Sequence, residues 1–338
     1  MTVSLCVIAY NEEEALPRLL KDIVQQDYPA EQMEIVLVDS MSEDRTRRIM
    51  EQFQKDNLRY KRVVVTENVK KNQAAGWNVA IRNSQEEVII RVDAHASIPA
   101  DFVRKNIECL KTGEYVSGGP RPNIAETPTN WQNVLLLAES SMFGSSIAKY
   151  RRKAEKTYVD SMFHAAYRRE VFVKSGLFDE QLGRTEDNEM HYRIRKNGYK
   201  LCFDPAIQSY QFTRSTLKKM LKQKFGNGKW VVLTLKACPQ CLSVFHFVPL
   251  AFVMGIALTT GLAVFHYPLL AVVMWILYWS LAVIMAILSV KGQKKCIQQL
   301  VLPVLFFLLH VSYGTGSIAG LIRLPFWHYK KHIEKIEN

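Results

Sequence analysis

The sequence lacks the glycine patterns that mark two large classes of nucleotide-binding protein. No G-x-G-x-x-G or G-x-x-x-x-G-K-[ST] motif follows its first strand-like segment, Val3 to Ala9. The first absence removes the main support for a dinucleotide-binding dehydrogenase, and the second removes it for a P-loop ATPase. Cysteine is also sparse, with six residues in 338. Cys238 and Cys241 form a C-x-x-C pair, but no second pair accompanies them, so no zinc site is expected.

Acidic residues are missing from a long C-terminal part of the chain. The formal net charge is +12, and the segment from Arg214 to Lys236 is rich in lysine without a single acid. From Ala237 to Val290, about 54 residues carry no charge, enough for two spanning helices of ~20 residues each. A basic stripe beside apolar spans marks the cytoplasmic face of a membrane. We do not expect nucleic acid as a partner, because the stripe adjoins the spans and offers few aromatic side chains.

The N-terminus shows neither a charged n-region nor a cleavage site, so we expect no signal peptide. The long domain ahead of the first span is then expected to stay in the cytosol, and its cysteines are expected to stay reduced. The sequence therefore predicts a multi-pass protein of the plasma membrane whose main domain lies on the cytoplasmic side.

Strand-like and helix-like segments alternate in the first hundred residues. Apolar, β-branched runs predict strands at 34–38, 60–65 and 88–92 in addition to the first, and helical patterns lie between them, one from Asn72 to Arg82. This alternation predicts an α/β fold with a Rossmann-like, mostly parallel sheet and flanking helices. Each strand ends in a polar cluster. Ligands of such sheets bind at the carboxyl ends of the strands, so these clusters indicate a nucleotide site.

Three acidic residues and one histidine stand out at these strand ends. Asp93 and His95 can grip one divalent cation at a turn; the alternative is an aspartate that caps the turn beside a surface histidine. Asp39 can accept the imide hydrogen of a uracil or a ribose hydroxyl, and Glu12 can do similar work. The segment DSMSEDRT is also a good helix start, in which Asp39 would be a turn or cap residue.

Four segments, in this order, resemble family 2 glycosyltransferases of the GT-A fold. AYNEE (9–13) is similar to their first strand end, and VDSMSEDRT (38–46) is similar to their nucleotide loop. KNQAAGWNVAI (71–81) resembles the helix before the metal site, and VDAH (92–95) stands where the family has Asp-x-Asp. A histidine in the last place is a known variant, found in the type that resembles succinoglycan-pathway glucosyltransferases.

The resemblance implies a sugar-nucleotide donor, expected to be a UDP-sugar, whose diphosphate is bridged by Mn2+ or Mg2+. Asp93 and His95 are the implied metal ligands, and an imidazole ligand suits manganese somewhat better. Lys71 would help to hold phosphate, although a solvated surface lysine is the alternative. The residues expected to bind the nucleotide sugar are Ala9, Tyr10, Asn11, Glu12, Asp39, Lys71 and Asp93.

A further segment that resembles the family contains Thr185-Glu186-Asp187. Thr185 is expected to cap a helix that runs from Glu186 to about Lys196, which puts Asp187 in the first turn. The resemblance implies that Asp187 is the general base for the acceptor hydroxyl, with Glu186 as an orienting or structural partner. A single displacement then inverts the anomeric configuration. The alternative is that both acids only complement the helix dipole.

Four residues are expected on the acceptor side: His164, His191, Gln223 and Trp230. Either histidine could instead be an ordinary packed residue. Gln223 and Trp230 belong to KQKFGNGKW, which keeps part of the Gln-x-x-Arg-Trp pattern of polymerising relatives, but the spacing is longer and Lys229 replaces the arginine. Together with only about three spans, this departure favours the addition of one sugar per encounter.

The membrane part is expected to follow a cytosolic domain over 1–213 and a basic juxtamembrane segment over 214–241. Within the membrane region, 242–322, spans are expected at 242–265 and 268–290. The third apolar segment, 297–322, is followed by a basic tail over 323–338, which a third span would place outside, against the positive-inside rule. A re-entrant or interfacial segment would resolve this conflict, but we expect a third span.

The sequence therefore predicts a membrane-anchored, inverting, metal-dependent and non-processive glycosyltransferase. It would move a sugar from a UDP-sugar to a polyprenyl-diphosphate-linked saccharide in exopolysaccharide or cell-envelope synthesis. Two alternatives stay open: a processive polysaccharide synthase of the same fold, and a non-catalytic membrane scaffold that binds a nucleotide. Asp39, Asp93 and Asp187 together argue against the scaffold, because a scaffold needs no base.

Overall fold

The computed structural model describes residues 1–125, 129–144, 155–212 and 216–336. The chain forms two compact units, each made of separate stretches of sequence. The first unit consists of Met1–Pro122, Lys149–Phe212 and Lys330–Asn338, and the second of Asn123–Ala148 and Thr213–Tyr329. The expected regions were contiguous along the chain. In the structure, Asn123–Ala148 instead belongs to the second unit, and Lys330–Asn338 belongs to the first.

The first unit is built on one sheet, which has eight strands in the described part of the chain. Its four long strands are parallel and lie in the order β3 (Arg62–Glu67), β2 (Met33–Asp39), β1 (Val3–Ala9) and β4 (Val88–Asp93). Shorter strands continue from β4 in the order β9 (Ala166–Arg168), β6 (Val116–Gly118), β10 (Leu201–Phe203) and β8 (Thr157–Val159). The predicted α/β fold with a mostly parallel sheet is confirmed.

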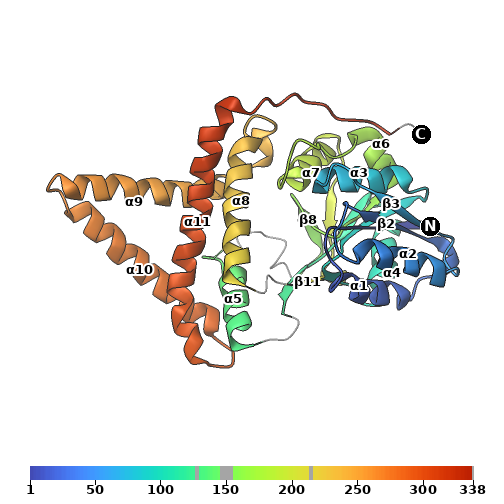
Figure 1. Ribbon diagram of the computed structural model, residues 1–338, viewed down its shortest axis with the longest axis horizontal. Helices are drawn as coiled ribbons and strands as arrows, with labels where there is room; N and C mark the ends of the chain where they lie inside the picture. The colour runs from blue at the N-terminus through green and yellow to red at the C-terminus, as the bar shows by residue number, and fades with distance from the viewer. Residues whose placement is uncertain (126–128, 145–154, 213–215, 337–338) are drawn as a thin grey trace. The chain divides into compact units, whose positions relative to one another are not determined.

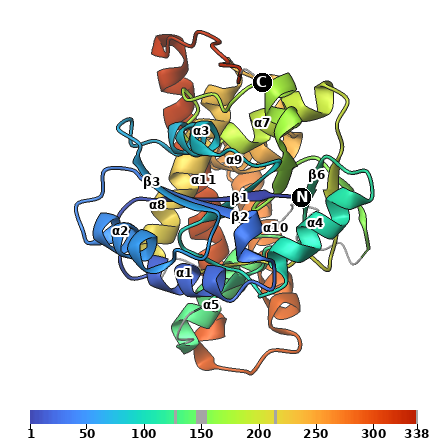
Figure 2. The same cartoon turned by 90° about the vertical axis from the view of Figure 1, so that its right-hand side faces the viewer.

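Helices cover both faces of this sheet (Figures 1 and 2). One face carries α1 (Leu16–Val24), α2 (Thr46–Asp56) and α4 (Phe102–Lys111), and the other carries α3 (Gln73–Asn83), α6 (Arg169–Ser175) and α7 (Glu186–Lys196). Beside the sheet, β5 (Ala96–Ser97) pairs with β11 (Tyr210–Phe212), which brings the segment after His95 against a later part of the chain. A 3-10 turn, Ala30–Gln32, precedes β2.

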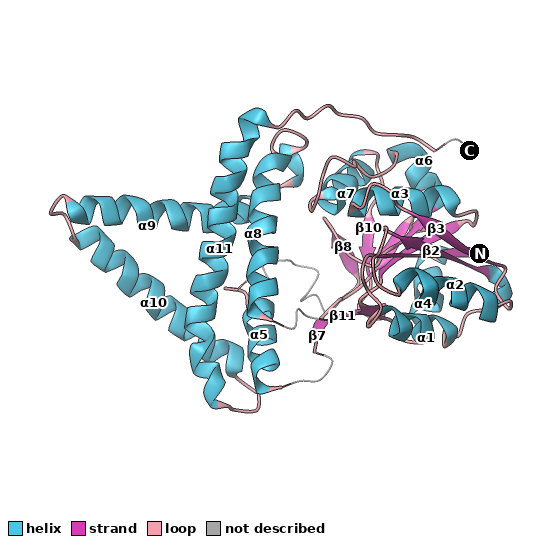
Figure 3. Ribbon diagram, in the orientation of Figure 1, coloured by secondary structure: helices cyan, strands magenta, loops and turns pink. Residues whose placement is uncertain are grey.

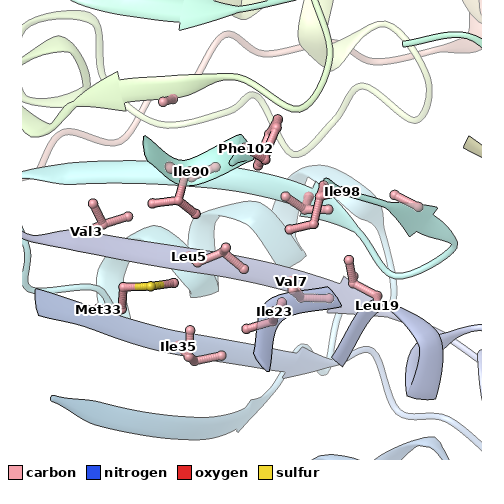
Figure 4. Close-up of a cluster of buried hydrophobic side chains, with 14 of the residues drawn as sticks. Val3, Leu5, Val7, Leu19, Ile23, Met33, Ile35, Ile90, Ile98 and Phe102 are labelled. Atoms are coloured by element: carbon pink, nitrogen blue, oxygen red, sulfur yellow. The ribbon is translucent and has the colours of Figure 1, made fainter. Parts of the chain in front are cut away.

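Alternate residues of the central strands form two cores, one on each face. Val3, Leu5 and Val7 of β1 point toward α1 and α4, where Figure 4 shows them packed with Leu19, Ile23 and Phe102. The residues between them, such as Cys6, point to the opposite core with Trp77 of α3. Strands buried on both faces read as continuous apolar runs, which is why the sequence revealed them.

The second unit is helical, apart from β7 (Asn123–Ile124). Its described helices are α5 (Asn130–Ser140), α8 (Leu217–Thr234), α9 (Val248–Val264), α10 (Leu269–Val290) and α11 (Leu302–Arg323), with 3-10 turns at Pro239–Cys241, Val244–Phe247, Ile297–Val301 and Leu324–Phe326. Among the described residues, three helical segments are long and apolar enough to cross a membrane: Val244–Val264, Leu269–Val290 and Ile297–Phe326. Within this unit α8 and α11 lie side by side, whereas α9 and α10 extend away from them and meet at a turn (Figure 3).

The end of the C-terminal tail, from Lys330, belongs to the first unit. The Leu177 N–H donates to the carbonyl oxygen of Glu334 at 2.8 Å, and the Glu334 carboxylate pairs with Arg82. Ile336 packs against the core that contains Trp77. The sequence predicted a basic tail, and in the structure its apolar Ile336 and its acidic Glu334 also have partners on the first unit.

Candidate functional site

The register of the sheet brings the predicted strand-end residues together. Ala9 lies opposite Asp39 in the ladder of β1 and β2, and Ile8 lies opposite Asp93 in the ladder of β1 and β4. The ends of three neighbouring parallel strands therefore fall at one edge of the sheet, as the crevice rule for open α/β sheets requires. Asp39 and Asp93 are thus separated by a single strand.

The loops after β1 and β2 are joined by hydrogen bonds. The Glu12 N–H donates to the Thr46 hydroxyl at 2.8 Å, and the Glu43 N–H donates to the side-chain oxygen of Asn11 at 2.9 Å. The Glu13 N–H donates to the Asp44 carboxylate at 3.1 Å. These bonds make the two resembling segments, AYNEE and DSMSEDRT, one connected surface at the strand ends.

Asp39 itself is nearly buried, with 4% of its surface exposed. The Ser42 N–H faces both oxygens of its carboxylate at 3.3 Å. This is the turn role that the sequence left open, and it leaves lone pairs on the carboxylate for a further donor. The role of Asp39 toward a nucleotide stays a prediction.

Left-handed backbone occurs in the loops after β1, β2 and β3 and in the loop before β9. Asn11, Met41, Lys71 and His164 have φ values of 54°, 62°, 55° and 47°, a left-handed conformation that residues other than glycine rarely adopt. Lys71 is exposed and lies just before α3, whose N-terminus is capped by Asn72. Such strain persists only where the surroundings impose it, and it concentrates at functional sites.

Asp93 is paired with His164. The His164 ring lies with Nε2 at 3.3 Å from Oδ2 of Asp93, while its Nδ1 lies at 3.0 Å from the Ser209 hydroxyl. Burial lowers the pKa of His164, so its neutral ring donates from Nε2 and accepts at Nδ1. Burial alone would raise the pKa of Asp93, but the bond from His164 and the nearby charges hold that pKa well below its usual range. Asp93 is therefore an ionised carboxylate at the strand end.

His95 lies between two side chains. Its Nδ1 is 3.2 Å from Oε1 of Glu12, and its Nε2 is 2.7 Å from the amide nitrogen of Gln211. The amide of Gln211 donates to Nε2 and in turn accepts from Arg121, whose guanidinium stacks on Phe163 at 4.0 Å. Both ring nitrogens of His95 therefore have a side-chain partner in this structure.

The donor set at this edge fits a divalent cation that is shared with a substrate. The described residues contain no group of three or more His, Cys, Asp or Glu that could hold a metal by themselves. Mg2+ is commonly held by one or two protein ligands together with substrate phosphates. Asp93 supplies an ionised carboxylate and His95, on the other side of Ala94, supplies an imidazole, so these two residues would hold Mn2+ or Mg2+ beside a diphosphate.

The predicted base, Asp187, is tied to the same strand through Arg91. Nη1 of Arg91 lies 2.9 Å from Oδ1 of Asp187, and both side chains are about nine-tenths buried. The guanidinium lies between the rings of Trp77 and Phe178, at 4.3 and 4.4 Å from their centres. Side chains two residues apart on a strand share one face, so Arg91 leaves β4 on the side of Asp93. β4 thus connects the expected metal ligand with the expected base.

Glu186 lies beside this pair in a different state. Burial and the neighbouring charge of Asp187 raise the pKa of Glu186 to about 8. Oε2 of Glu186 has no hydrogen-bond partner within the described residues. The two adjacent acids therefore differ, since Asp187 faces a guanidinium and Glu186 is kept protonated at neutral pH. Thr185 occupies the N-cap position, but its side chain makes no capping bond to the helix.

His191 belongs to the support of this group. It is fully buried, with the Tyr167 hydroxyl 2.8 Å from Nε2 and the Ser161 hydroxyl 3.0 Å from Nδ1. Burial lowers its pKa to about 4, so the ring is neutral. Its imidazole offers no surface to a sugar in this structure.

Gln223 and Trp230 lie on α8 of the second unit. The Trp230 ring meets Trp327 edge to face at 6.1 Å. Their role on the acceptor side stays a prediction, as does that of His164, which the structure places against Asp93.

Three residues of the first unit were missed in the sequence: Arg91, Arg121 and Gln211. Only Arg91 left a usable signal, because it is the one charged residue inside the apolar run VIIRV. A charge in a strand buried on both faces requires a buried partner. Arg121 and Gln211 sit in irregular segments whose approach to His95 no local pattern reveals.

Comparisons with known proteins agree with the family that the sequence motifs resemble. The model for glycosyl transferase family 2 matches residues 4–176. A Methanococcus voltae protein, dolichyl N-acetyl-alpha-D-glucosaminyl phosphate 3-beta-D-2,3-diacetamido-2,3-dideoxy-beta-D-glucuronosyltransferase, is 28% identical over 95% of this chain and 97% of its own length. The succinoglycan biosynthesis protein ExoA of Rhizobium meliloti is also 28% identical, over 68% of each chain.

Solved structures share the fold at low identity. A Pyrobaculum calidifontis mannosyltransferase, solved with GDP-Man and Mn2+, matches with a TM-score of 0.55 and 18% identity, over 96% of this chain and 87% of that one. The S. aureus protein TarS, residues 1–349, matches with a TM-score of 0.52 and 17% identity, over 98% and 93% of the two chains.

Proposed function

The chain belongs to glycosyl transferase family 2, and on this basis we propose that it moves one sugar from a UDP-sugar to a polyprenyl-diphosphate-linked saccharide. The transfer would occur at the cytoplasmic face of the plasma membrane, in the synthesis of an exopolysaccharide or another cell-envelope polysaccharide. The family that the four sequence motifs indicated is thereby confirmed, and the protein is a glycosyltransferase. Donor, acceptor and mechanism are the parts that we propose.

One observation carries the proposed mechanism. Two carboxylates with separate tasks are held by one strand: Asp93 ends β4, and Asp187 is bound to Arg91 of β4 at 2.9 Å. Glycosyl transfer with inversion needs negative charge to be stabilised on the leaving diphosphate and a proton to be removed from the acceptor hydroxyl. A common strand fixes the distance between the groups that do this, which is what positioned catalysis requires.

At the donor end, Asp93 and His95 would hold Mn2+ or Mg2+, which when bound stabilises charge on the departing diphosphate. His164 and Glu12 orient these two ligands through their hydrogen bonds, as partners behind metal ligands commonly do. Asp39 and Glu12 would accept hydrogens from the uracil or ribose. Lys71 and the strand end at Ala9, Tyr10 and Asn11 complete the donor side.

At the acceptor end, Asp187 would take the proton from the attacking hydroxyl. Arg91 holds this carboxylate in place through their ion pair at 2.9 Å. Glu186 stays neutral and acts as a structural neighbour. His164, Gln223 and Trp230 remain candidates for contacts with the acceptor saccharide or its lipid.

The relatives support this choice of substrates. The Methanococcus voltae protein is named for a dolichyl sugar phosphate acceptor, and ExoA is named for succinoglycan biosynthesis. The Pyrobaculum calidifontis structure contains Mn2+, and a TarS structure contains UDP-GlcNAc. A lipid-linked acceptor also suits a chain with long apolar helices.

The test is a donor screen on the full chain purified in detergent. UDP release is followed with Mn2+ and a panel of UDP-sugars, with and without a polyprenyl-linked acceptor extract. One sugar is expected to support release, EDTA is expected to stop it, and Asp187→Asn is expected to lower kcat by at least about 100-fold. Asp56→Asn, an exposed acid at the end of α2, is the matched control and should keep the activity.

The alternatives give different results. A scaffold would bind UDP without releasing it from any donor, and Asp187→Asn would not change that binding. A processive synthase would add many sugars to one acceptor, which mass spectrometry of the lipid product would reveal. Release that survives both EDTA and Asp187→Asn would contradict the proposed roles of the site residues.

A further inference from the structure

The third apolar helix, α11, has surroundings unlike those of α9 and α10. The most apolar stretch of Ile297–Phe326 is 39% buried inside the protein, against 0% for Val244–Val264 and 17% for Leu269–Val290. Its main partner is α8, which it contacts more extensively than any other helix of the described unit (Figure 3). The position of α11 relative to a membrane therefore depends on what α8 can tolerate.

Glycines bring α8 and α11 into backbone contact. A Cβ at Gly228 would lie 2.0 Å from the carbonyl oxygen of Tyr313, and one at Gly316 would lie 2.1 Å from that of Phe225. The Ser312 hydroxyl donates to the carbonyl oxygen of Leu221 at 2.8 Å. Helices locked together along their length at this distance must share one depth in a bilayer.

α8 is unsuited to the interior of a bilayer. Its eighteen residues include five lysines and no acid, and Lys218, Lys219 and Lys222 are exposed. Burying a charged side chain in the hydrocarbon core costs free energy, whereas lysines near the membrane surface are attracted by anionic lipid headgroups. Lys218, Lys222 and Lys229 fall on one stripe of the helix, as the 3.6-residue period requires.

α5 fixes the same layer independently. It has 11 residues, so it is ~16 Å long, about half the ~30 Å thickness of the hydrocarbon core. Oε1 of Glu139 on α5 lies 3.7 Å from Nζ of Lys224 on α8, and both side chains are more than nine-tenths buried. α5 also contacts α11. A helix too short to cross is therefore packed against both α8 and α11.

The connectivity of the chain gives the number of crossings. The chain leaves the first unit after Phe212 and belongs to it again from Lys330. The bond from Leu177 N–H to Glu334 O holds the returning tail on that unit. Both ends of the intervening segment are thus on one side of the membrane, which requires an even number of crossings.

We propose that α5, α8 and α11 form a layer in the headgroup region of the cytoplasmic leaflet, and that α9 and α10 alone of the described helices cross the bilayer. The partner of this surface is the lipid phosphate, which the lysines of α8 contact. The turn at His266, Tyr267 and Pro268 then reaches the opposite side. This arrangement replaces the third span that the sequence led us to expect, and it removes the conflict with the basic tail.

The first experiment maps sidedness in intact cells with a membrane-impermeant maleimide. The full chain carries Cys241→Ser and Cys296→Ser, which remove its two cysteines that are not buried. Single cysteines are then placed at His266, at Lys331 and, as a cytoplasmic control, at the exposed Leu58. His266→Cys is expected to be labelled from outside. Lys331→Cys and Leu58→Cys are expected to stay unlabelled in intact cells and to be labelled only after the cells are permeabilised.

The second experiment measures depth with brominated lipids in vesicles. An environment-sensitive fluorophore is attached at the exposed positions Val304, Thr315 and Leu321 of α11 and at Leu277 of α10. All three α11 probes are expected to be quenched equally by shallow bromines, and Leu277 by deep ones. Variants are compared only if they stay in the membrane after alkaline washing.

Three results would overturn the proposal. The first is labelling of Lys331→Cys in intact cells, because the tail would then lie outside. The second is a Thr315 probe as deep as Leu277, with Val304 and Leu321 near the two surfaces, because α11 would then cross. The third is a His266→Cys that stays unlabelled in intact cells, because α9 and α10 would then fail to reach the far side.

Discussion

Arg91 is a cation placed inside a strand that is otherwise apolar. It is 6% exposed, and such a group is tolerated in a core only with a compensating partner. Asp187 supplies the opposite charge, while Trp77 and Phe178 supply the faces of two rings for the guanidinium. The geometry therefore gives Arg91 a positioning role toward Asp187, the expected base.

Arg91→Met is expected to lower kcat by about 100-fold or more, since it frees the expected general base. Arg91→Lys keeps the charge and should lower kcat less than Arg91→Met does. Arg104→Met, which removes an exposed arginine paired with Asp27, is the control and should keep kcat. An unchanged kcat in Arg91→Met would show that Arg91 does not position the base.

Glu186 gives a prediction for stability against pH. Its pKa is raised from 4.5 to about 8 in the folded state, so its contribution is fully present below pH 4.5 and is lost as the pH rises toward 8. Glutamine imitates the protonated form at every pH. Glu186→Gln should therefore have nearly the native Tm at pH 5 and a higher Tm at pH 8.5. At about 1.4 kcal/mol per pKa unit, the free energy of unfolding at pH 8.5 should rise by at most several kcal/mol.

Thermal unfolding in detergent, scanned at both pH values, measures this difference. Glu186→Gln should also keep its transferase activity at pH 7, in contrast to Asp187→Asn. A variant that is no more stable than the native chain at pH 8.5 would show that Glu186 is not held neutral.

At the scale of elements, α8 decides the membrane arrangement. A lysine at the centre of a spanning helix costs ~2.5–3.5 kcal/mol, whereas a leucine or valine contributes only ~0.3–0.6 kcal/mol. The five lysines of α8 therefore outweigh its apolar residues by on the order of 10 kcal/mol. α11 reads as a span by itself, and only its packing on α8 overrides that reading.

The glycine contacts between α8 and α11 can be tested directly. Gly228→Val should push the helices apart, because its Cβ would overlap the carbonyl oxygen of Tyr313. Such overpacking costs about 1–3 kcal/mol or more, so the Tm of the protein in detergent should fall by several degrees. Gly261→Val on α9 is the matched control, since a Cβ there meets nothing within 4 Å. Equal Tm values for the two variants would contradict this packing.

At the scale of the whole molecule, the C-terminal end of the chain returns to the first unit. The first unit is completed by the tail, through the backbone bond from Leu177 to Glu334 and the packing of Ile336. The ion pair of Arg82 and Glu334 adds little, because both side chains are at least a third exposed. The tail is thus held mainly by its backbone and its apolar side chains.

Deletion of residues 330–338 is expected to lower the Tm of the first unit while leaving the protein in the membrane, since α9 and α10 are untouched. Glu334→Gln keeps the backbone bond and should change the Tm much less, because the exposed ion pair contributes under about 1 kcal/mol to the free energy of unfolding. Differential scanning fluorimetry and membrane fractionation measure both effects. A deletion that leaves the Tm unchanged would mean that the tail does not stabilise this unit.

The sequence by itself determined the parallel sheet, the strand-end residues Asp39 and Asp93, the helix that begins at Glu186, and the long apolar helices. These features depend on neighbours within a few positions along the chain, whose periodicity and polar breaks are visible in the sequence. The sequence also sufficed for the family, because four motifs occur in the right order.

Only the tertiary structure decided which side chains meet. His164 lies against Asp93 although they are 71 positions apart in the sequence. Arg91 of β4 likewise meets Asp187 of α7. Such contacts depend on strand register and on helix packing, which no local pattern contains. The return of the tail and the pairing of α11 with α8 depend on the same long-range contacts. The protonation states of Asp93 and Glu186 follow from those neighbours, because burial and adjacent charge set the pKa of a buried acid.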